Sequence, residues 1–590
     1  MKCSINLLLF VSGIVISMGT VRCTTEERAA NSENIPGFYA NGPAGGWDTA
    51  DWAGFHHQSI EESLLPIRPG EPGKSPFWNG YAKRFIYAPS FDFSPVNSAV
   101  KYRYSVISDV NSKHYIFETN NPWSLLTPVW KEVPVGIVYL KVEGLDREGN
   151  SIGMAGEKLF YKAAPFHGPY KQPVTDYTSS VIRNMQSLLK LDHYGQWKTD
   201  NTPSQEYELY CYPSKIVGSI IQAMTIYSRL SERESEDAVQ MARNAAKYLL
   251  SISFPPGSVL EFFPPTYLDR TKGRAIARRL KDQVMMFYPA IVGSAYLDLY
   301  DVTGDKEYLE ASIKIAETYS KTQLPEGSWP LMVWIESGDA AGENLCVPTD
   351  IINLFDRLVI NYGKTQFSEN SKKAFNWIME NPMKTYHWEA QFEDSGHSEN
   401  YSNMERGKPL AFAVILLSHS EEVPGYIAMA EELIRFAEDQ FVVWEQPLPR
   451  ELFRTSGRPI PRSVSYTSKW FTPCVLEQYN FYTPIDASSA SAIMAYKKAY
   501  EITGKELYLA KAISLADNLT VAQDLDDGIY PTYLNLTAKI RFSNATTSNE
   551  PNNVWTGWIN GATITSVALL ELNELVSQTE VQSKNVYNHE

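Results

Sequence analysis

The chain has 590 residues and a formal net charge of −15. An acidic balance of this size argues against a nucleic-acid partner and against binding to an anionic membrane surface. Beyond the N-terminal segment, no stretch approaches the roughly 18 uninterrupted apolar residues that a membrane span needs, so no membrane span is expected.

The N-terminus has the pattern of a secretory signal. A single lysine is followed by an apolar run over residues 5–18 and then by small residues. This order predicts a signal peptide over residues 1–23 and export to the periplasm or the medium. Cys23 offers a lipoprotein alternative, but Arg22 precedes it where a small residue is usual, so soluble export is the favoured interpretation.

The cysteines beyond the signal favour neither a disulfide framework nor a zinc cluster. Cys211, Cys346 and Cys474 lie far apart, without C-x-x-C spacing. The chain also lacks H-E-x-x-H, G-x-S-x-G, Walker and G-x-G-x-x-G motifs in their proper context. We therefore expect no metal and no cofactor.

An N-terminal β-domain is predicted over residues 33–165. Between residues 77 and 161, runs such as AVKYRYSVI and VGIVYLKVEGL alternate apolar and polar residues and are separated by turn signals. Such spacing favours a β-sandwich of the fibronectin or immunoglobulin-like kind. The short junction 164–174 is rich in proline and glycine, so this domain is expected to be structural and to pack against a neighbour. That neighbour is the rest of the chain or a second subunit, which leaves a homo-oligomer open.

From residue 175 to about 580 the apolar period becomes helical. Twelve helices are predicted, at about 176–190, 214–230, 236–251, 283–301, 305–321, 349–362, 367–380, 407–418, 424–440, 485–502, 505–522 and 557–577. Within successive pairs the connections are short and glycine-containing, as at Thr303–Gly304 and Thr503–Gly504. Between pairs the connections are long and aromatic.

Two of these pairs are internal repeats of one another. Residues 293–330 match residues 491–531, with identical residues at 295, 296, 300, 303, 304, 308, 309, 316 and 323 and at the positions 200 further on. Repetition of this kind indicates stacked helix hairpins that cannot bury their apolar faces alone. Six hairpins predict a mainly α fold, an (α/α)6 toroid preceded by the β-sandwich.

The first helix of each hairpin is apolar on all sides and is expected to form the inner ring, whereas the second carries charged stripes and is expected to be outer. The long connections then lead into the N-termini of the inner helices. These connections are residues 191–213, 252–282, 323–348, 381–406, 441–484 and 523–556. Because long loops and helix N-termini converge at this end of the ring, chemistry is expected there.

Carboxylates cluster at these entry points. Glycosidic bond hydrolysis needs one carboxyl to protonate the leaving oxygen and another to act as base or nucleophile. The candidates are Asp282, Asp350, Glu405, Glu477 and Asp486. The alternative for each of them is an ordinary helix cap.

The long connections also supply side chains that bind sugars. Flat aromatic faces stack on sugar rings, and arginine binds carboxylates with two parallel hydrogen bonds. Arg406 is the candidate for an anionic group and His397 for a polar contact or proton transfer. The aromatic candidates are Tyr207, Trp329, Trp334, Tyr401, Tyr482, Trp555 and Trp558. Against this, long loops often bury their own aromatic residues, and arginines often neutralise neighbouring acids.

Four short segments carry a resemblance to carbohydrate-active enzymes: PFHGPY at the junction, EGSWP from Glu326, NMERGKPLAFA from Asn403 and YTPIDASSASA from Tyr482. The chain resembles the exo-β-glucuronidases of glycoside hydrolase family 154 over about residues 75–577. It is also similar in outline to unsaturated glucuronyl hydrolases and to heparosan-type glucuronyl C5-epimerases. The resemblance implies an exported hydrolase that removes terminal β-glucuronic acid from a polysaccharide or oligosaccharide.

Two other functions remain open from the sequence. A uronate lyase or epimerase needs a base for the proton at C5, and Tyr401, His397, Tyr479 or Tyr482 could serve. A glycan-capture protein needs the aromatics alone, without two carboxylates across a common pocket.

Overall fold

A closed ring of helices dominates the structure. The computed structural model describes residues 47–67, 82–389, 391–393, 401–445, 470–479, 482–534 and 557–587. By their contacts, residues 43–590 form one unit. The predicted signal peptide lies outside the described residues.

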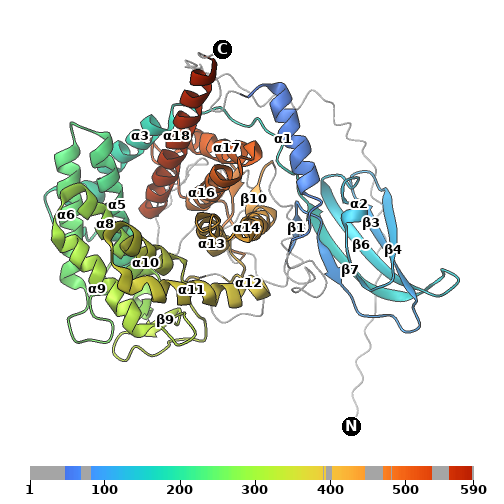
Figure 1. The fold of residues 1–590 in the computed structure, drawn as a ribbon, viewed down its shortest axis with the longest axis horizontal. Helices are drawn as coiled ribbons and strands as arrows, with labels where there is room; N and C mark the ends of the chain where they lie inside the picture. Colours follow the sequence, from blue (N-terminus) through green and yellow to red (C-terminus); the bar gives the residue numbers. More distant parts are fainter. Residues whose placement is uncertain are drawn as a thin grey trace, which may run out of the picture. The chain divides into compact units, whose positions relative to one another are not determined.

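Six inner helices contact one another in chain order, and the last contacts the first, which closes the ring (Figure 1). They are α5 (Pro213–Leu230), α8 (Tyr288–Thr303), α10 (Thr349–Tyr362), α13 (Gly407–Ser418), α16 (Asp486–Thr503) and α18 (Ile559–Tyr587). Each pairs with an outer helix: α6 (Ser235–Ile252), α9 (Lys306–Thr322), α11 (Ser368–Glu380), α14 (Gly425–Phe441), α17 (Glu506–Ala522) and, with α18, α3 (Tyr177–Leu189). These are the twelve predicted helices, in the predicted inner and outer order.

One helix boundary differs clearly from the prediction. α8 begins at Tyr288 rather than near residue 283. Residues 283–285 instead form strand β8 (Gln283–Met285), which pairs antiparallel with β9 (Met332–Trp334). Pro289 then occupies the first turn of α8, where its missing N–H costs nothing.

Short elements lie in the long connections. They are α4 (Asp192–Gly195), α7 (Ala275–Arg279), α12 (Pro382–Thr385), β10 (Val442–Val443) and β11 (Cys474–Val475), together with four 3₁₀ turns at Gln196–Lys198, Glu208–Cys211, Thr365–Phe367 and Gln523–Leu525. None of the helices in the described ranges is long and apolar enough to cross a membrane.

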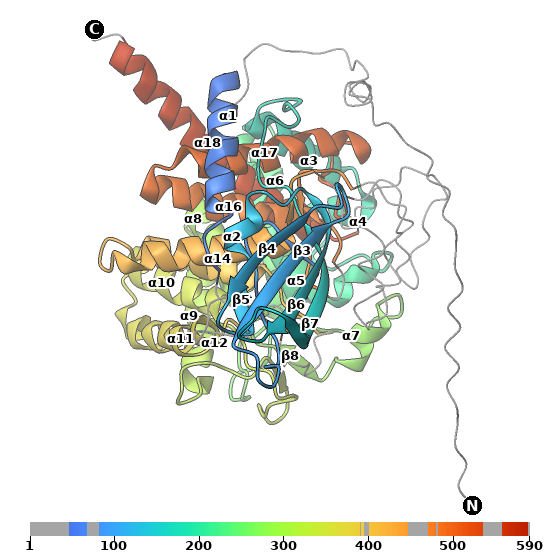
Figure 2. The same cartoon turned by 90° about the vertical axis from the view of Figure 1, so that its right-hand side faces the viewer.

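The N-terminal domain contains one five-stranded sheet in the order β1-β7-β6-β3-β4. Its strands are β1 (Arg84–Phe85), β3 (Lys101–Ser108), β4 (His114–Thr119), β6 (Gly136–Leu145) and β7 (Ser151–Lys162), antiparallel except for the β1–β7 pair. Figure 2 shows β4, β3, β6 and β7 next to one another.

The second sheet that a fibronectin-like sandwich requires is not seen in the described part of this domain. The sheet is covered by the short β2 (Ser90–Asp92)–β5 (Trp123–Leu125) pair and by α2 (Thr127–Trp130). Phe91 of β2 packs on Phe85 and Phe160 of the large sheet, and Trp130 stacks on Phe160. The alternation of apolar and polar residues therefore predicted the strands correctly, but it did not predict how many sheets the domain contains.

Helix α1 (Thr49–Glu62) precedes the sheet and was not predicted. Asp48 accepts hydrogen bonds from the backbone of Ala50 and Asp51, and the Asp51 carboxylate accepts one from the Asp48 backbone. This reciprocal capping box fixes the start of the helix. Trp52 and Phe55 are its buried aromatics.

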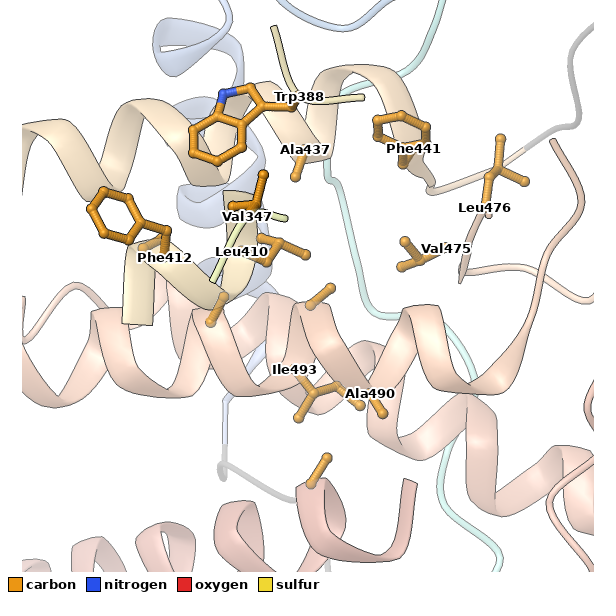
Figure 3. Close-up of a cluster of buried hydrophobic side chains, with 14 of the residues drawn as sticks. Val347, Trp388, Leu410, Phe412, Ala437, Phe441, Val475, Leu476, Ala490 and Ile493 are labelled. Carbon is orange, nitrogen blue, oxygen red and sulfur yellow. The ribbon is translucent and has the colours of Figure 1, made fainter. Parts of the chain in front are cut away.

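Apolar side chains from neighbouring hairpins fill the space between the helices. Figure 3 shows such a cluster, with Leu410 and Phe412 of α13, Phe441 of α14 and Ile493 of α16. All four are at most 3% exposed. Burial of each large side chain stabilises the fold by about 1.5–3 kcal/mol, so close packing holds the inner helices in place.

Asp517 of α17 gives a testable pH dependence of stability. Its carboxylate accepts a hydrogen bond of 2.7 Å from the hydroxyl of Tyr177 on α3, and burial raises its pKa to about 8. Between about pH 4 and pH 8 the unfolded chain loses this proton while the folded chain keeps it, so stability falls as pH rises. In Asp517→Asn the free energy of unfolding should therefore fall less steeply across this window than in the wild type, by up to about 1.4 kcal/mol per pH unit.

Urea unfolding at several pH values measures both slopes. Asp524→Asn is the matched control, because Asp524 is also near the end of the α17 hairpin but exposed, in a 2.7 Å pair with Arg183. Parallel slopes for wild type and Asp517→Asn would contradict the prediction.

Candidate active site

A cavity of about 460 Å³ opens where inner helices begin. Tyr212 directly precedes α5, Arg406 directly precedes α13, and Trp558 directly precedes α18, while Tyr288 and Asp486 are the first residues of α8 and α16. The full lining is Tyr212, Lys215, Ser219, Gln222, Arg274, Ile276, Phe287, Tyr288, Ile291, Phe392, Glu393, Arg406, Glu477, Ile485, Asp486, Ala487, Ser491, Thr532, Tyr533, Trp558, Asn560, Gly561 and Ile564. The partial positive charge of several helix N-termini therefore faces one space, which favours anionic groups.

Asp486 is the most deeply buried carboxyl of the lining, at 1% exposure. Its Oδ1 atom accepts a hydrogen bond of 2.7 Å from the Ala487 N–H, whereas its buried Oδ2 atom has no partner within the described residues. Burial raises the pKa of this carboxyl well above its usual value of 3.8, against the smaller opposite effects of nearby backbone N–H groups and the Thr565 hydroxyl. This raised pKa favours the protonated form of the Asp486 carboxyl, which is the form that can give up a proton.

Gly561 of α18 allows this arrangement. A Cβ atom at position 561 would lie 2.6 Å from Oδ1 and 2.8 Å from Oδ2 of Asp486. Because such contacts are too short for any side chain, a glycine here lets α18 approach the acid closely.

Tyr533 lies near both Asp486 and Glu477. Tyr533 pairs with Ile485 through an isolated β-bridge, which brings its segment against the start of α16. Burial raises the pKa of the Tyr533 hydroxyl well above 10, and the charges of Glu477 and Asp486 add to the effect. Tyr533 is thus a common neighbour of two carboxyls that both line the cavity.

A third carboxyl comes from another connection. Glu393 lies near Tyr212, where it adds to the effect of burial in raising the pKa of that hydroxyl. Glu393 and Glu477 are both partly buried. The cavity is therefore lined by three carboxyl groups, of which Asp486 is the most deeply buried.

Cations surround the ring of Trp558. Nζ of Lys215 lies 3.8 Å from the ring centroid, and the guanidinium carbon of Arg274 lies 5.6 Å from it. The ring of Tyr212 is 5.5 Å away. An aromatic face flanked by positive charges suits a sugar that carries an anionic substituent.

Four of the candidates taken from the sequence line this cavity: Glu477, Asp486, Arg406 and Trp558. The other three acids lie outside the lining. Asp282 is exposed, Asp350 bonds to the Lys408 ammonium, and Glu405 binds the first backbone N–H groups of α13.

Four further aromatic candidates among the described residues are not part of the lining and donate hydrogen bonds to backbone carbonyls. Such bonds are formed by Tyr207 with Gly557, by Trp329 with Tyr319, by Tyr401 with Thr385 and by Tyr482 with Gln440. Trp334 is 44% exposed on β9. His397 and Trp555 lie outside the described residues.

Several lining residues were absent from the sequence candidates. Tyr212, Arg274, Phe287 and Tyr533 reach the cavity through the packing of distant connections. A local signal existed for two positions: a tyrosine stands directly before proline at 212–213 and at 288–289, each at the start of an inner helix.

Comparison with known proteins gives only distant similarities. No protein-family model matches the sequence, and no curated protein matches it. The structure is similar to a family 76 glycoside hydrolase from a bovine Bacteroides thetaiotaomicron strain, at 9% identity over 84% of this chain and 99% of that chain, with a TM-score of 0.44. It is also similar to a D-mannose isomerase (12% identity, 61% and 86% coverage, TM-score 0.42) and to an unsaturated glucuronyl hydrolase from Streptococcus agalactiae (11%, 67% and 91%, 0.41). At these values the similarities assign no activity to the chain.

Proposed function

We propose that the protein is an exported glycoside hydrolase that releases a terminal uronic acid, β-linked glucuronic acid in the first instance, from a polysaccharide or oligosaccharide. The observation that carries the proposal is that the buried Asp486 carboxyl, whose pKa is raised by burial, lines the same cavity as the less buried Glu477. Hydrolysis of a glycosidic bond needs one protonated and one ionised carboxyl, and the burial of Asp486 favours the protonated form at that position.

In this mechanism Asp486 donates its proton to the oxygen of the leaving group as the glycosidic bond breaks. Glu477 acts as the second carboxylate, either by activating water or by attacking the sugar directly. Glu393 is the alternative for this second role, since it lines the same cavity.

The size and charge of the cavity support a sugar acid as the substrate. A volume of about 460 Å³ lies within the usual range of small-molecule sites. Lys215, Arg274 and Arg406 offer cationic donors to a carboxylate. The N-terminal signal pattern supports export, and we expect neither a nucleic-acid partner nor a cofactor.

A lyase or epimerase is less well supported. Of the tyrosines first considered as the base, Tyr401, Tyr479 and Tyr482 all have their hydroxyls bonded within the fold. The cavity tyrosines 212 and 533 have pKa values raised by burial, which disfavours the tyrosinate that would remove a C5 proton.

Incubation of the wild-type protein with glucuronate-terminated oligosaccharides tests the proposal. Hydrolysis should release free glucuronic acid without a rise in ultraviolet absorbance, whereas elimination would create an absorbing unsaturated product. Binding of the oligosaccharide without any product would instead support the glycan-capture alternative and reject the hydrolase.

A further inference from the structure

Behind the cavity, four charged side chains form a group at the start of α13. Asp350 of α10 bonds to Nζ of Lys408, and Nη1 of Arg406 lies 3.4 Å from Oε2 of Glu405. Of the four, only Arg406 lines the cavity. The group therefore reaches the cavity through Arg406.

Arg406 lines the cavity and forms an ion pair with Glu405. It is 6% exposed, and Glu405 is its acidic partner. Its buried Nε atom has no hydrogen-bond partner within the described residues. A guanidinium has five N–H donors in a fixed plane, so Arg406 keeps donors for an anionic or hydroxyl group bound in the cavity.

Glu405 is fixed by the helix that follows it. Its carboxylate accepts hydrogen bonds from the backbone N–H groups of Gly407 and, at 2.7 Å, of Lys408. A Cβ atom at position 407 would lie 3.0 Å from its Oε2 atom, so the glycine gives the carboxylate room to fold back onto the helix. Glu405 is thus directed toward α13 and is bound there, at 2% exposure.

The Asp350–Lys408 ion pair contacts Phe287, an aromatic residue of the cavity lining. Nζ of Lys408 lies 4.2 Å from the centroid of Phe287, which lines the cavity. Asp350 balances the charge of Lys408, as Glu405 balances that of Arg406. One pair therefore places the Arg406 cation in the cavity lining, and the other places the Lys408 cation against Phe287 of the lining. Neither pair adds net charge.

We propose that Glu405 is a positioning residue rather than a proton donor: it orients the Arg406 guanidinium so that Arg406 binds the bound sugar acid. The inference rests on the proposed function. It predicts that loss of the Glu405 charge weakens binding of the substrate and leaves the chemical step intact.

The test is a double-mutant cycle with Glu405→Gln and Arg406→Met, with KM and kcat measured separately. Glutamine keeps the size of the side chain and one acceptor for the backbone N–H groups. Glu405→Gln should raise KM about tenfold with little change in kcat, because one charged hydrogen bond to Arg406 is lost. In the Arg406→Met background, Glu405→Gln should change KM less than twofold, because the guanidinium that Glu405 orients is then absent.

Asp298→Asn is the matched control. Asp298 forms a partly buried ion pair of 2.7 Å with Arg357, but it lies outside the lining of the cavity. It should leave KM unchanged. If Arg406→Met fails to fold, Arg406→Lys replaces it, because lysine keeps the charge and loses the planar fork.

Two results would overturn the inference. A fall in kcat of a hundredfold or more in Glu405→Gln at unchanged KM would make Glu405 catalytic. An equal rise in KM with and without Arg406 would make the role of Glu405 purely structural.

If the wild type shows no turnover, the hydrolase function fails, and calorimetric binding of free glucuronate to the same variants decides the positioning role of Glu405. Absence of glucuronate binding by the wild type would reject that role as well.

Discussion

Asp486→Asn is expected to lower kcat by about 10²- to 10⁴-fold, with KM changed by less than a few fold. Asparagine has nearly the same shape and can keep the hydrogen bond from the Ala487 N–H. It cannot supply a proton to the leaving oxygen, so the loss should fall on the chemical step. Steady-state kinetics on a glucuronide substrate measure the effect.

Stability separates this loss from unfolding. In the wild type, burial raises the pKa of the Asp486 carboxyl in the folded chain above its value in the unfolded chain, so this carboxyl lowers the stability of the fold as the pH rises above about 4. Asparagine does not titrate, so the variant should be at least as stable as the wild type near pH 7. Asp356→Asn is the control, because the Asp356 carboxyl on α10 is partly buried, accepts a hydrogen bond of 2.5 Å from the Ser371 hydroxyl and lies outside the lining of the cavity. A comparable loss of kcat in this control would show that the effect of Asp486→Asn is not local.

The second large effect concerns a buried charge group that joins α1 to the outer helices. Nζ of Lys511 on α17 lies 2.8 Å from both Glu62 of α1 and Glu438 of α14. The Lys511 and Glu438 side chains are at most 1% exposed. Lys511→Met would remove the cation that pairs with both buried acids, so we expect a loss of about 3–5 kcal/mol in the free energy of unfolding.

Urea unfolding at pH 7 gives this quantity. Lys497→Met is the matched control: Lys497 also lies between two acids, Glu501 and Glu571, but those acids are 28% and 42% exposed. Its loss should stay below about 1 kcal/mol. Adding Glu438→Gln to Lys511→Met should recover part of the stability, because it removes one of the uncompensated charges. Equal losses in the two lysine variants would show that the Lys511 group does not hold α1 to the ring.

The same region shows why the N-terminal domain packs as it does. The Asp439 carboxylate on α14 accepts hydrogen bonds from the backbone N–H groups of Ile86, at 2.6 Å, and Tyr87, at 2.8 Å. The Tyr87 hydroxyl reaches Glu62 and Glu438 of the Lys511 group. These buried contacts support the expectation of a structural role for the N-terminal domain, which the expression of residues 33–165 alone would test.

The helical fold was predictable because its signal is local and repeated. Periodicity and the glycine that ends the first helix of several hairpins marked the helices, and left-handed Gly304, Gly363 and Gly504 stand at those ends. Helix α1 was missed because its capping box at Asp48 and Asp51 precedes a weakly patterned, polar helix. The predicted second sheet of the β-sandwich went beyond the sequence signal. Alternation of apolar and polar residues indicates which face of a strand is buried, but not whether a sheet or a helix covers that face.

The site was predictable only in part. Residues at the starts of inner helices, such as Arg406 and Asp486, could be placed because the ring brings those starts together. Whether an aromatic of a long connection turns inward is decided by tertiary packing, so Trp329 belongs to the core while Trp558 lines the cavity. The pKa of Asp486 likewise depends on burial by several elements, which no local pattern encodes.

The most direct test of the central claim, that Asp486 protonates the leaving group, is a series of aryl β-glucuronides with leaving groups of increasing pKa. A good leaving group departs without a proton, so Asp486→Asn should lose little activity on a dinitrophenyl glucuronide and progressively more as the leaving-group pKa rises. The logarithm of the rate should therefore fall more steeply with leaving-group pKa in the variant than in the wild type. An equal loss for every leaving group would contradict the assignment of Asp486 as the acid.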